Sequence, residues 1–188
     1  MIEYKGSFLI GSTVSLRGVR REDMAAYGSW LDDDRVTKYL EMGWRPTTEK
    51  DLEAAFRLLA ETPTVVGFMI MDRQSEKAIG TCGLYSIDWI SRRAQFNILI
   101  GEPTAWDKGF GTEALELLVS YGFDRLNLES IQLGVNAENT RAIRSYQKAG
   151  FVQEGRRRKF IFRDGCYYDS ILMSMLREEY KINSNNDA

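Results

Sequence analysis

Histidine is absent from the 188 residues of this chain, and both cysteine and proline are rare. Without histidine, the chain cannot build a Ser-His-Asp triad, a Cys-His nucleophile pair, a histidine zinc site or an imidazole general base. Its two cysteines, Cys82 and Cys166, are far apart in the sequence and indicate neither a disulfide framework nor a metal site. Any catalysis must therefore use tyrosine, carboxylates, backbone dipoles and water, and no metal is expected.

Long apolar runs and an excess of positive charge are also missing. No apolar run reaches the roughly 20 residues of a membrane-spanning helix, and the first residues lack the pattern of a signal peptide. The net charge of −2 disfavours a nucleic-acid binder, and the basic run 156–159 is typical of a solvated strand face, or of a surface that attracts an anionic cofactor. We expect a cytoplasmic protein that binds neither membranes nor nucleic acid.

What is present fits one globular domain. The chain is 44% hydrophobic and 28% charged, as is usual for a globular protein, and it is long enough for one sizeable core. We expect a single domain over residues 1–180 and a disordered polar tail over 181–188. A homodimer or higher homo-oligomer is compatible with this class.

Hydrophobic periodicity predicts a mixed α/β domain. Apolar stripes at helical spacing predict helices after a first short strand, and further strands and helices follow without a linker or an internal repeat. The predicted strands are 13–16, 65–71, 78–87, 94–100, 131–135, 151–162 and 166–176, and the predicted helices are 21–31, a short segment at 35–39, one opened by Pro46, one running from Ala114 and one over 140–149.

The segment 106–114 joins a strand to a helix through two glycines, Gly109 and Gly111, with Phe110 between them. Such a turn exposes backbone N–H groups at the positive end of a helix dipole, and glycine lets an anion approach the backbone closely. The pattern suits a phosphate or pyrophosphate. Taken alone, it also describes an ordinary tight helix start.

A second motif, N-x-x-A-x-x-x-Y-x-K-x-G-F, runs from Asn139 to Phe151. Together with the W-D-K-G-F-G of residues 106–111, it resembles the GCN5-related N-acetyltransferases (GNAT), in the branch with the ribosomal-protein alanine, spermidine and nucleotide-aminosugar acetyltransferases. The resemblance extends from Leu16 to Asp169. It implies a mixed, mostly antiparallel sheet of about seven strands flanked by helices, and transfer of an acetyl group from acetyl-CoA to a primary amine by direct attack in a ternary complex.

The resemblance also implies where acetyl-CoA binds. The pyrophosphate would rest on the glycine loop, and the pantetheine arm would pair with the preceding strand, where a backbone N–H near Leu99 would face the thioester oxygen. Trp106 stands where the family usually has Gln or Arg, so backbone groups would hold the pyrophosphate. The implied cofactor-binding residues are Ile98, Leu99, Ile100, Trp106, Lys108, Gly109, Phe110, Gly111, Thr112, Asn139 (also a helix N-cap) and Lys148.

Tyr146 is the residue that the resemblance assigns to catalysis. It sits seven residues after Asn139, where the family places a tyrosine facing the cofactor sulfur. Because thiols have a pKa of about 8.5 and tyrosine about 10, a phenol can protonate the departing thiolate. Helical spacing alone favours a packing residue beside Ala142 and Ile143, and the motif reverses that preference.

The general base and the acceptor stay open. Related enzymes often carry a glutamate at the position of Gln95, whose neutral amide cannot accept a proton; Asp88 and Glu41 are candidate bases, although such carboxylates are more often simply exposed. Three acceptors are considered: a polyamine held by carboxylates such as Glu41, a protein N-terminus, and an aminosugar contacting Gln95, Asn97 and an aromatic such as Tyr85. The alternative function is a non-catalytic acyl-CoA-binding module.

Overall fold

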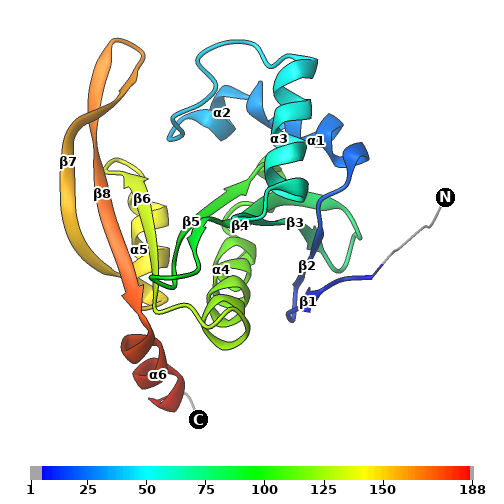
Figure 1. The fold of residues 1–188 in the computed structure, drawn as a ribbon. Helices are drawn as coiled ribbons and strands as arrows, with labels where there is room; N and C mark the ends of the chain where they lie inside the picture. Colours follow the sequence, from blue (N-terminus) through cyan, green and yellow to red (C-terminus); the bar gives the residue numbers. More distant parts are fainter. Residues whose placement is uncertain (1–5, 187–188) are drawn as a thin grey trace.

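A computed structural model describes residues 6–186. They form an open eight-stranded sheet in the order β1-β2-β3-β4-β5-β6-β8-β7 (Figure 1). Neighbouring strands are antiparallel except for β5 and β6, which are parallel. The strands are β1 Leu9–Ile10, β2 Val14–Gly18, β3 Val66–Asp72, β4 Ala78–Asp88, β5 Arg93–Ile100, β6 Ser130–Asn136, β7 Val152–Arg163 and β8 Cys166–Leu176.

Helices occupy the connections. They are α1 Met24–Leu31, α2 Asp34–Thr37, α3 Glu49–Glu61, α4 Phe110–Ser120, α5 Thr140–Lys148 and α6 Arg177–Asn186, with 3-10 turns at Arg21–Asp23 and Pro103–Ala105 and a π-helical turn at Tyr121–Arg125. Local side chains fix where helices begin. The backbone N–H of Asp51 donates to Thr48 Oγ1 (3.3 Å) while its carboxylate accepts from the Thr48 N–H (2.9 Å), a capping box that opens α3.

The predicted fold class is confirmed: the sheet is mixed and mostly antiparallel, and helices flank it. The eighth strand is β1, which has only two residues and pairs with β2 through Leu9 and Ile10. A two-residue strand carries no periodicity, so no sequence pattern could predict it.

The chain end differs from the expected disordered tail. Helix α6 begins directly after β8 and continues to Asn186, so residues 181–186 are helical, and residues 187–188 lie outside the described part. Its first turn is anchored on the rest of the protein: Arg177 donates to the Phe123 carbonyl (2.7 Å), and the ring of Tyr180 stacks on Phe123 at 4.9 Å between ring centres. This anchoring is tertiary, which a polar tail composition does not reveal.

The sheet separates two apolar cores of unequal size. Phe68 and Ile70 on β3 face the larger core, which also contains Leu118 of α4. Met69, between them, points to the opposite face and packs with Trp30 and neighbouring residues of the smaller core. Period-2 alternation therefore places α4 and α5 on one face of the sheet and the α1–α2 region on the other.

The pairing of β5 with β6 covers only three residue pairs, Arg93 to Gln95 with Ser130 to Gln132. Beyond these pairs the two strands separate, as Figure 1 shows between the green β5 and the yellow-green β6. The sheet therefore consists of two halves joined at one end of a split. Strands β1–β5 form the first half, and β6, β8 and β7 form the second.

Close approach of β4 to β5 requires a glycine at position 80. A Cβ added at Gly80 would overlap the backbone carbonyl oxygen of Leu99, which cannot move without shifting β5. We expect Gly80→Ala to cost about 1–3 kcal/mol by overpacking, which lowers the melting temperature of a domain of this size by several degrees. Thermal unfolding followed by circular dichroism measures it.

Gly18→Ala is the matched control, because a Cβ built on Gly18 meets nothing within 4 Å. It should leave the melting temperature within about a degree or two of the wild-type value. Equal melting temperatures for the two variants would show that the approach of β4 to β5 is not tight.

Candidate active site

A cavity of about 690 Å³ lies in the split between β5 and β6. Its size is within the range of about 300–1,000 Å³ that is usual for small-molecule sites. It is lined by the free end of β5, the start of α4, the inner face of α5 and residues 35, 36 and 38–40 of the α2 region. The predicted cofactor and catalytic residues that it brings together are Ile98, Leu99, Ile100, Trp106, Gly109, Phe110, Gly111, Thr112, Asn139 and Tyr146.

The start of α4 presents backbone N–H groups to this cavity. Gly109 is the helix N-cap with φ +82°, a left-handed conformation that glycine adopts without strain. The N–H groups of Phe110, Gly111 and Thr112 fall in the first turn, where a helix has no intrahelical partner for them. A Cβ added at Gly111 would lie 3.4 Å from Cγ1 of Ile100, so this turn faces β5. The arrangement suits an anion.

Glu113, in the same turn, holds the helix start in place. Its carboxylate accepts hydrogen bonds from the backbone N–H groups of Thr13 (3.0 Å) and Val14 (3.2 Å), and it also contacts the Ser12 N–H and the Thr13 hydroxyl. These bonds tie α4 to the turn between β1 and β2. The N–H groups at the cavity are therefore presented by a fixed helix.

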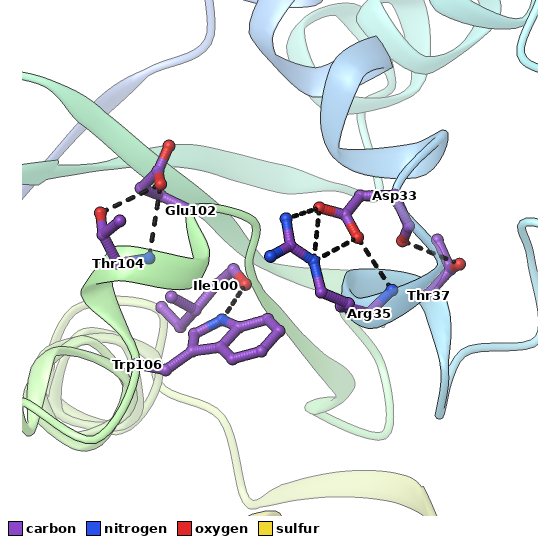
Figure 2. A network of polar contacts seen from close by, with 7 residues as sticks. All are labelled: Asp33, Arg35, Thr37, Ile100, Glu102, Thr104 and Trp106. Atoms are coloured by element: carbon purple, nitrogen blue, oxygen red, sulfur yellow. Dashed lines mark hydrogen bonds and ion pairs between the residues drawn. The ribbon is translucent and has the colours of Figure 1, made fainter.

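Trp106 forms part of the cavity wall beside β5. Its Nε1 donates to the Ile100 carbonyl oxygen at 2.9 Å, as Figure 2 shows. On the other side, the Arg141 guanidinium lies 5.2 Å from the indole ring centre and pairs with Asp107 at 3.2 Å. The indole thus links the free end of β5 to the start of α5.

Arg35 adds a second cation to the wall. Figure 2 shows its guanidinium against Asp33, with Nη2 at 2.6 Å and Nε at 3.0 Å from the carboxylate oxygens. The same carboxylate accepts the Arg35 backbone N–H (2.9 Å) and so caps α2, and the Arg35 side chain lowers the pKa of Asp33. Lys38 lines the cavity as well. Because Asp33 offsets the charge of Arg35, Lys38 supplies the net positive charge of this wall.

Tyr146 lies on the inner face of α5, with only 9% of its surface exposed. Its ring packs edge-on against Phe96, 6.1 Å between centres, and against Phe151 at 5.9 Å. Among the described residues no fully buried side-chain nitrogen or oxygen lacks a partner, and none of these residues hydrogen-bonds the Tyr146 hydroxyl, so that oxygen reaches the cavity. Burial raises the pKa of Tyr146 to about 12, which keeps it protonated at neutral pH.

The backbone of Leu99 faces β4 and not the open strand edge. The Gly101 N–H donates to the Ile79 oxygen of the β4 side, whereas the carbonyl of Ile100 is turned the other way and accepts from Trp106. Backbone groups of successive strand residues point to opposite sides, so the N–H groups of Ile98 and Ile100 face the split. The N–H near Leu99 that could face a thioester oxygen is therefore that of Ile98 or Ile100.

Two predicted cofactor residues and all five predicted acceptor residues lie outside the cavity lining. Lys108 and Lys148 are adjacent to lining segments but are not part of the wall. Tyr85, Gln95 and Asn97 share one face of the sheet, since Tyr85 pairs with Gln95 and the neighbours of Gln95 on β5 are buried on the opposite face. They form a neutral polar surface on the face of the α1–α2 region.

Asp88 and Glu41 are poorly placed to act as the general base. Asp88 accepts the backbone N–H groups of Ile90 (3.0 Å) and Ser91 (2.9 Å), and the Ser91 bond lowers the pKa of Asp88. It also pairs with Arg93 at 3.4 Å, so its lone pairs are occupied in a turn. Glu41 is exposed, one residue beyond the lining segment 35–40.

The sequence reasoning missed several lining residues. Arg35, Lys38, Tyr39 and Leu40 come from the α2 region, more than fifty residues before β5 in the chain, and no local pattern connects the two. Arg141 and Ser145 could have been found, because both fall inside the second motif and lie four residues apart, on one face of a helix. Ser145 Oγ lies 2.9 Å from Thr112 Oγ1 and so joins α5 to α4.

Among residues 6–186, no group of three or more histidine, cysteine, aspartate or glutamate side chains could hold a metal ion. None of the helices in this part of the chain is long and apolar enough to cross a membrane.

Comparison with known proteins agrees with this geometry. The model of the acetyltransferase (GNAT) domain family matches residues 13–152. The chain is 38% identical to the spermidine N(1)-acetyltransferase of Escherichia coli (strain K12), over 89% of this chain and 88% of that protein. It is 32% identical to the uncharacterized N-acetyltransferase p20 of Bacillus licheniformis, over 89% of this chain and 94% of that protein.

Among solved structures, spermidine N-acetyltransferase from Vibrio cholerae in complex with CoA and spermine superposes with a TM-score of 0.82 at 29% identity. The match covers 91% of this chain and 99% of that one. The family model spans most of the chain, and relatives more than 30% identical align over nearly all of it. The chain therefore belongs to the GNAT family and is an N-acetyltransferase.

Proposed function

We propose that this protein transfers the acetyl group of acetyl-CoA to a small primary amine, by direct attack of the amine on the thioester in a ternary complex. The observation that carries the proposal is the cavity in the β5–β6 split, which connects the N-terminus of α4 to the hydroxyl of Tyr146. One end of this cavity suits a pyrophosphate and the other holds a proton donor. The similar solved structure from Vibrio cholerae holds CoA and spermine, which supports a CoA thioester and an amine as the two substrates here.

The residues of this chain fit acetyl-CoA at three points. The first-turn N–H groups of α4 can bind the pyrophosphate, with Arg35, Lys38 and Arg141 adding positive charge. The free edge of β5, from Ile98 to Ile100, can pair with the amides of the pantetheine arm as an added strand would. Burial of these bonds in the split excludes water from the thioester.

The glycine loop generates the first functional prediction. Gly111→Asp places a carboxylate in the helix turn that would face the phosphates, and like charges repel there. Acetyl-CoA should raise the melting temperature of the wild type, as a ligand of the native state does, and this rise should disappear in Gly111→Asp. Gly111→Ala is the control: its Cβ finds ordinary contact distance to Ile100, so it tests bulk without charge. Retained acetyl-CoA affinity in Gly111→Asp would remove this loop from the site.

Tyr146 is proposed to donate its proton to the departing thiolate. Burial raises the pKa of the phenol to about 12, which makes it a weaker acid than a thiol in water. The leaving sulfur would be buried in the same cavity, where loss of solvation also raises the pKa of the thiol and reduces this mismatch. The hydroxyl therefore donates a hydrogen bond that strengthens while charge develops on sulfur, and the proton moves along this bond to the departing thiolate.

Tyr146→Phe tests this role, because it removes the hydroxyl and keeps the ring that packs on Phe96 and Phe151. We expect kcat to fall about 10²-fold or more, and KM for acetyl-CoA to change little, since the lost interaction belongs to the transition state. Steady-state release of free thiol near pH 8 measures both constants.

Melting curves of Tyr146→Phe control for its folding.

In the wild type, the raised pKa of Tyr146 means that its hydroxyl stays protonated, so ionisation of Tyr146 should not lower the rate until the pH approaches about 12. A variant that keeps half of the wild-type kcat, with chemistry shown to be rate-limiting, would leave Tyr146 as a packing residue and assign the proton to water.

The acceptor is proposed to bind on the sheet face that carries Tyr85, Gln95 and Asn97. A polyamine is the first candidate, since two relatives that are 38% and 36% identical are spermidine N(1)-acetyltransferases. An aminosugar is the second, because these three side chains are neutral and Tyr85 can stack on a ring. Gln95 cannot accept a proton and Asp88 is occupied, so we propose that the amine loses its proton to water.

A panel of polyamines, aminosugars and peptide N-termini, assayed by thiol release, tests the function directly. Gln95→Glu should raise kcat/KM for polyamines relative to aminosugars, because a partly desolvated carboxylate prefers an ammonium partner. Gln74→Glu, in the exposed turn between β3 and β4, controls for added surface charge. No turnover with any amine would refute the proposed function, and an unchanged preference in Gln95→Glu would show that this side chain does not contact the acceptor.

A further inference from the structure

Arg163, the last residue of β7, joins the tip of the β7–β8 hairpin to the α2 region. Its Nη1 donates to the carbonyl oxygens of Thr37 (2.8 Å) and Met42 (3.2 Å), and its Nη2 donates to Thr37 Oγ1 (3.1 Å) and approaches Asp34 at 3.4 Å. Only 14% of the Arg163 side chain is exposed. A largely buried guanidinium with several acceptors fixes geometry far better than a surface ion pair does.

The segment held by Arg163 is a wall of the cavity. The lining residues of this segment are Arg35, Val36, Lys38, Tyr39 and Leu40, while Thr37 and Arg163 lie behind the wall. Thr37, which Arg163 binds twice, is only 1% exposed, and Gly43 with φ +85° brings the following loop against it. A Cβ at Gly43 would lie 2.6 Å from Cβ of Thr37, so this loop has no room to shift inwards. Arg163 and the loop at Gly43 therefore hold this wall from the side that faces away from the cavity.

This contact crosses the split in the sheet. Segment 34–42 belongs to the first half, together with β1–β5, and the β7–β8 hairpin belongs to the second half (Figure 1). The two halves pair through only three residue pairs of β5 and β6, at the opposite end of the split. On the other face, Thr112–Ser145 joins α4 to α5, and Asp107–Arg141 joins the loop before α4 to α5, across the same opening. The open end is thus bridged on both faces.

We propose that Arg163 is a positioning residue that sets the width of the acetyl-CoA cleft by holding segment 34–42 from across the split. The inference rests on the proposed function for the identity of the ligand. Loss of Arg163 frees the wall while Tyr146 and the α4 turn stay in place, since neither contacts Arg163. Acetyl-CoA binding therefore weakens, and the chemical step on bound substrate is largely preserved.

Arg163→Ala and Arg163→Lys test the proposal, with Arg158→Ala as the matched control. Arg158 is exposed on the same strand, so its loss removes the same charge without a bridge to segment 34–42. In Arg163→Ala we expect the Kd for acetyl-CoA, measured by calorimetry well below the melting transition, to rise about 10- to 100-fold with kcat changed much less. The Kd of Arg163→Lys should lie between those of the wild type and Arg163→Ala. Millimolar guanidinium should partly restore acetyl-CoA affinity in Arg163→Ala.

A ligand-free measurement separates this proposal from the proposed function. Amide hydrogen exchange of residues 34–42 should accelerate in Arg163→Ala and stay at the wild-type rate in Arg158→Ala. If residues 34–42 of Arg163→Ala exchanged at the wild-type rate, the positioning role would be overturned. The same holds if Arg163→Ala melted earlier but kept the wild-type Kd for acetyl-CoA, and both conclusions are independent of the amine that the wild type acetylates. A wild type that binds acetyl-CoA and turns over no amine would refute the proposed function and leave the positioning role supported by the shifts in Kd and exchange.

Discussion

The site depends on one constraint: within residues 6–186, β5 and β6 form the only parallel strand pair, and their pairing stops after three residue pairs. Backbone groups of β5 beyond Gln95 then have no neighbouring strand on that side, and such groups need a hydrogen-bond partner. The Trp106 indole supplies one for Ile100. The others face a cavity that an extended, amide-containing ligand could fill as a strand would. The unpaired edge of β5 is thus available to bind a ligand.

The cavity and the neighbouring sheet face outside its lining differ in chemistry. The side of α4 and α5 offers a helix N-terminus and Arg141, and the α2 segment adds Arg35 and Lys38, which together suit a phosphate-bearing ligand. The sheet face with Tyr85, Gln95 and Asn97 is neutral and polar. The neutral face lies outside the cavity lining, so an acceptor bound there would not compete with a phosphate-bearing ligand for one pocket, as the proposed direct transfer requires.

A sheet divided into two halves needs bridges, and side chains outside the strand ladder supply them. Arg163 spans one face, the Thr112–Ser145 pair spans the other, and Glu113 anchors α4 to the β1–β2 turn. Tyr146 is held by ring packing on Phe96, so its hydroxyl needs no protein partner and remains available to a ligand. Residues such as Arg163 and Glu113 therefore hold the site rigid, while Tyr146 keeps its hydroxyl free for a ligand.

The sequence by itself determined the mixed α/β class, the glycine turn of α4 and the N-cap at Asn139, because each rests on spacing within one strand or helix. Tyr146, which lines the cavity, was singled out by the motif resemblance, since its helical spacing alone favoured a packing residue. Tertiary structure decided the α2 wall, the bridge from Arg163 to Thr37, and the anchored start of α6, since these contacts join segments dozens of residues apart or more. It also decided the backbone direction at Leu99 and the occupied state of Asp88. Local periodicity says which face a side chain takes, but only the pairing of strands says which backbone group is left free.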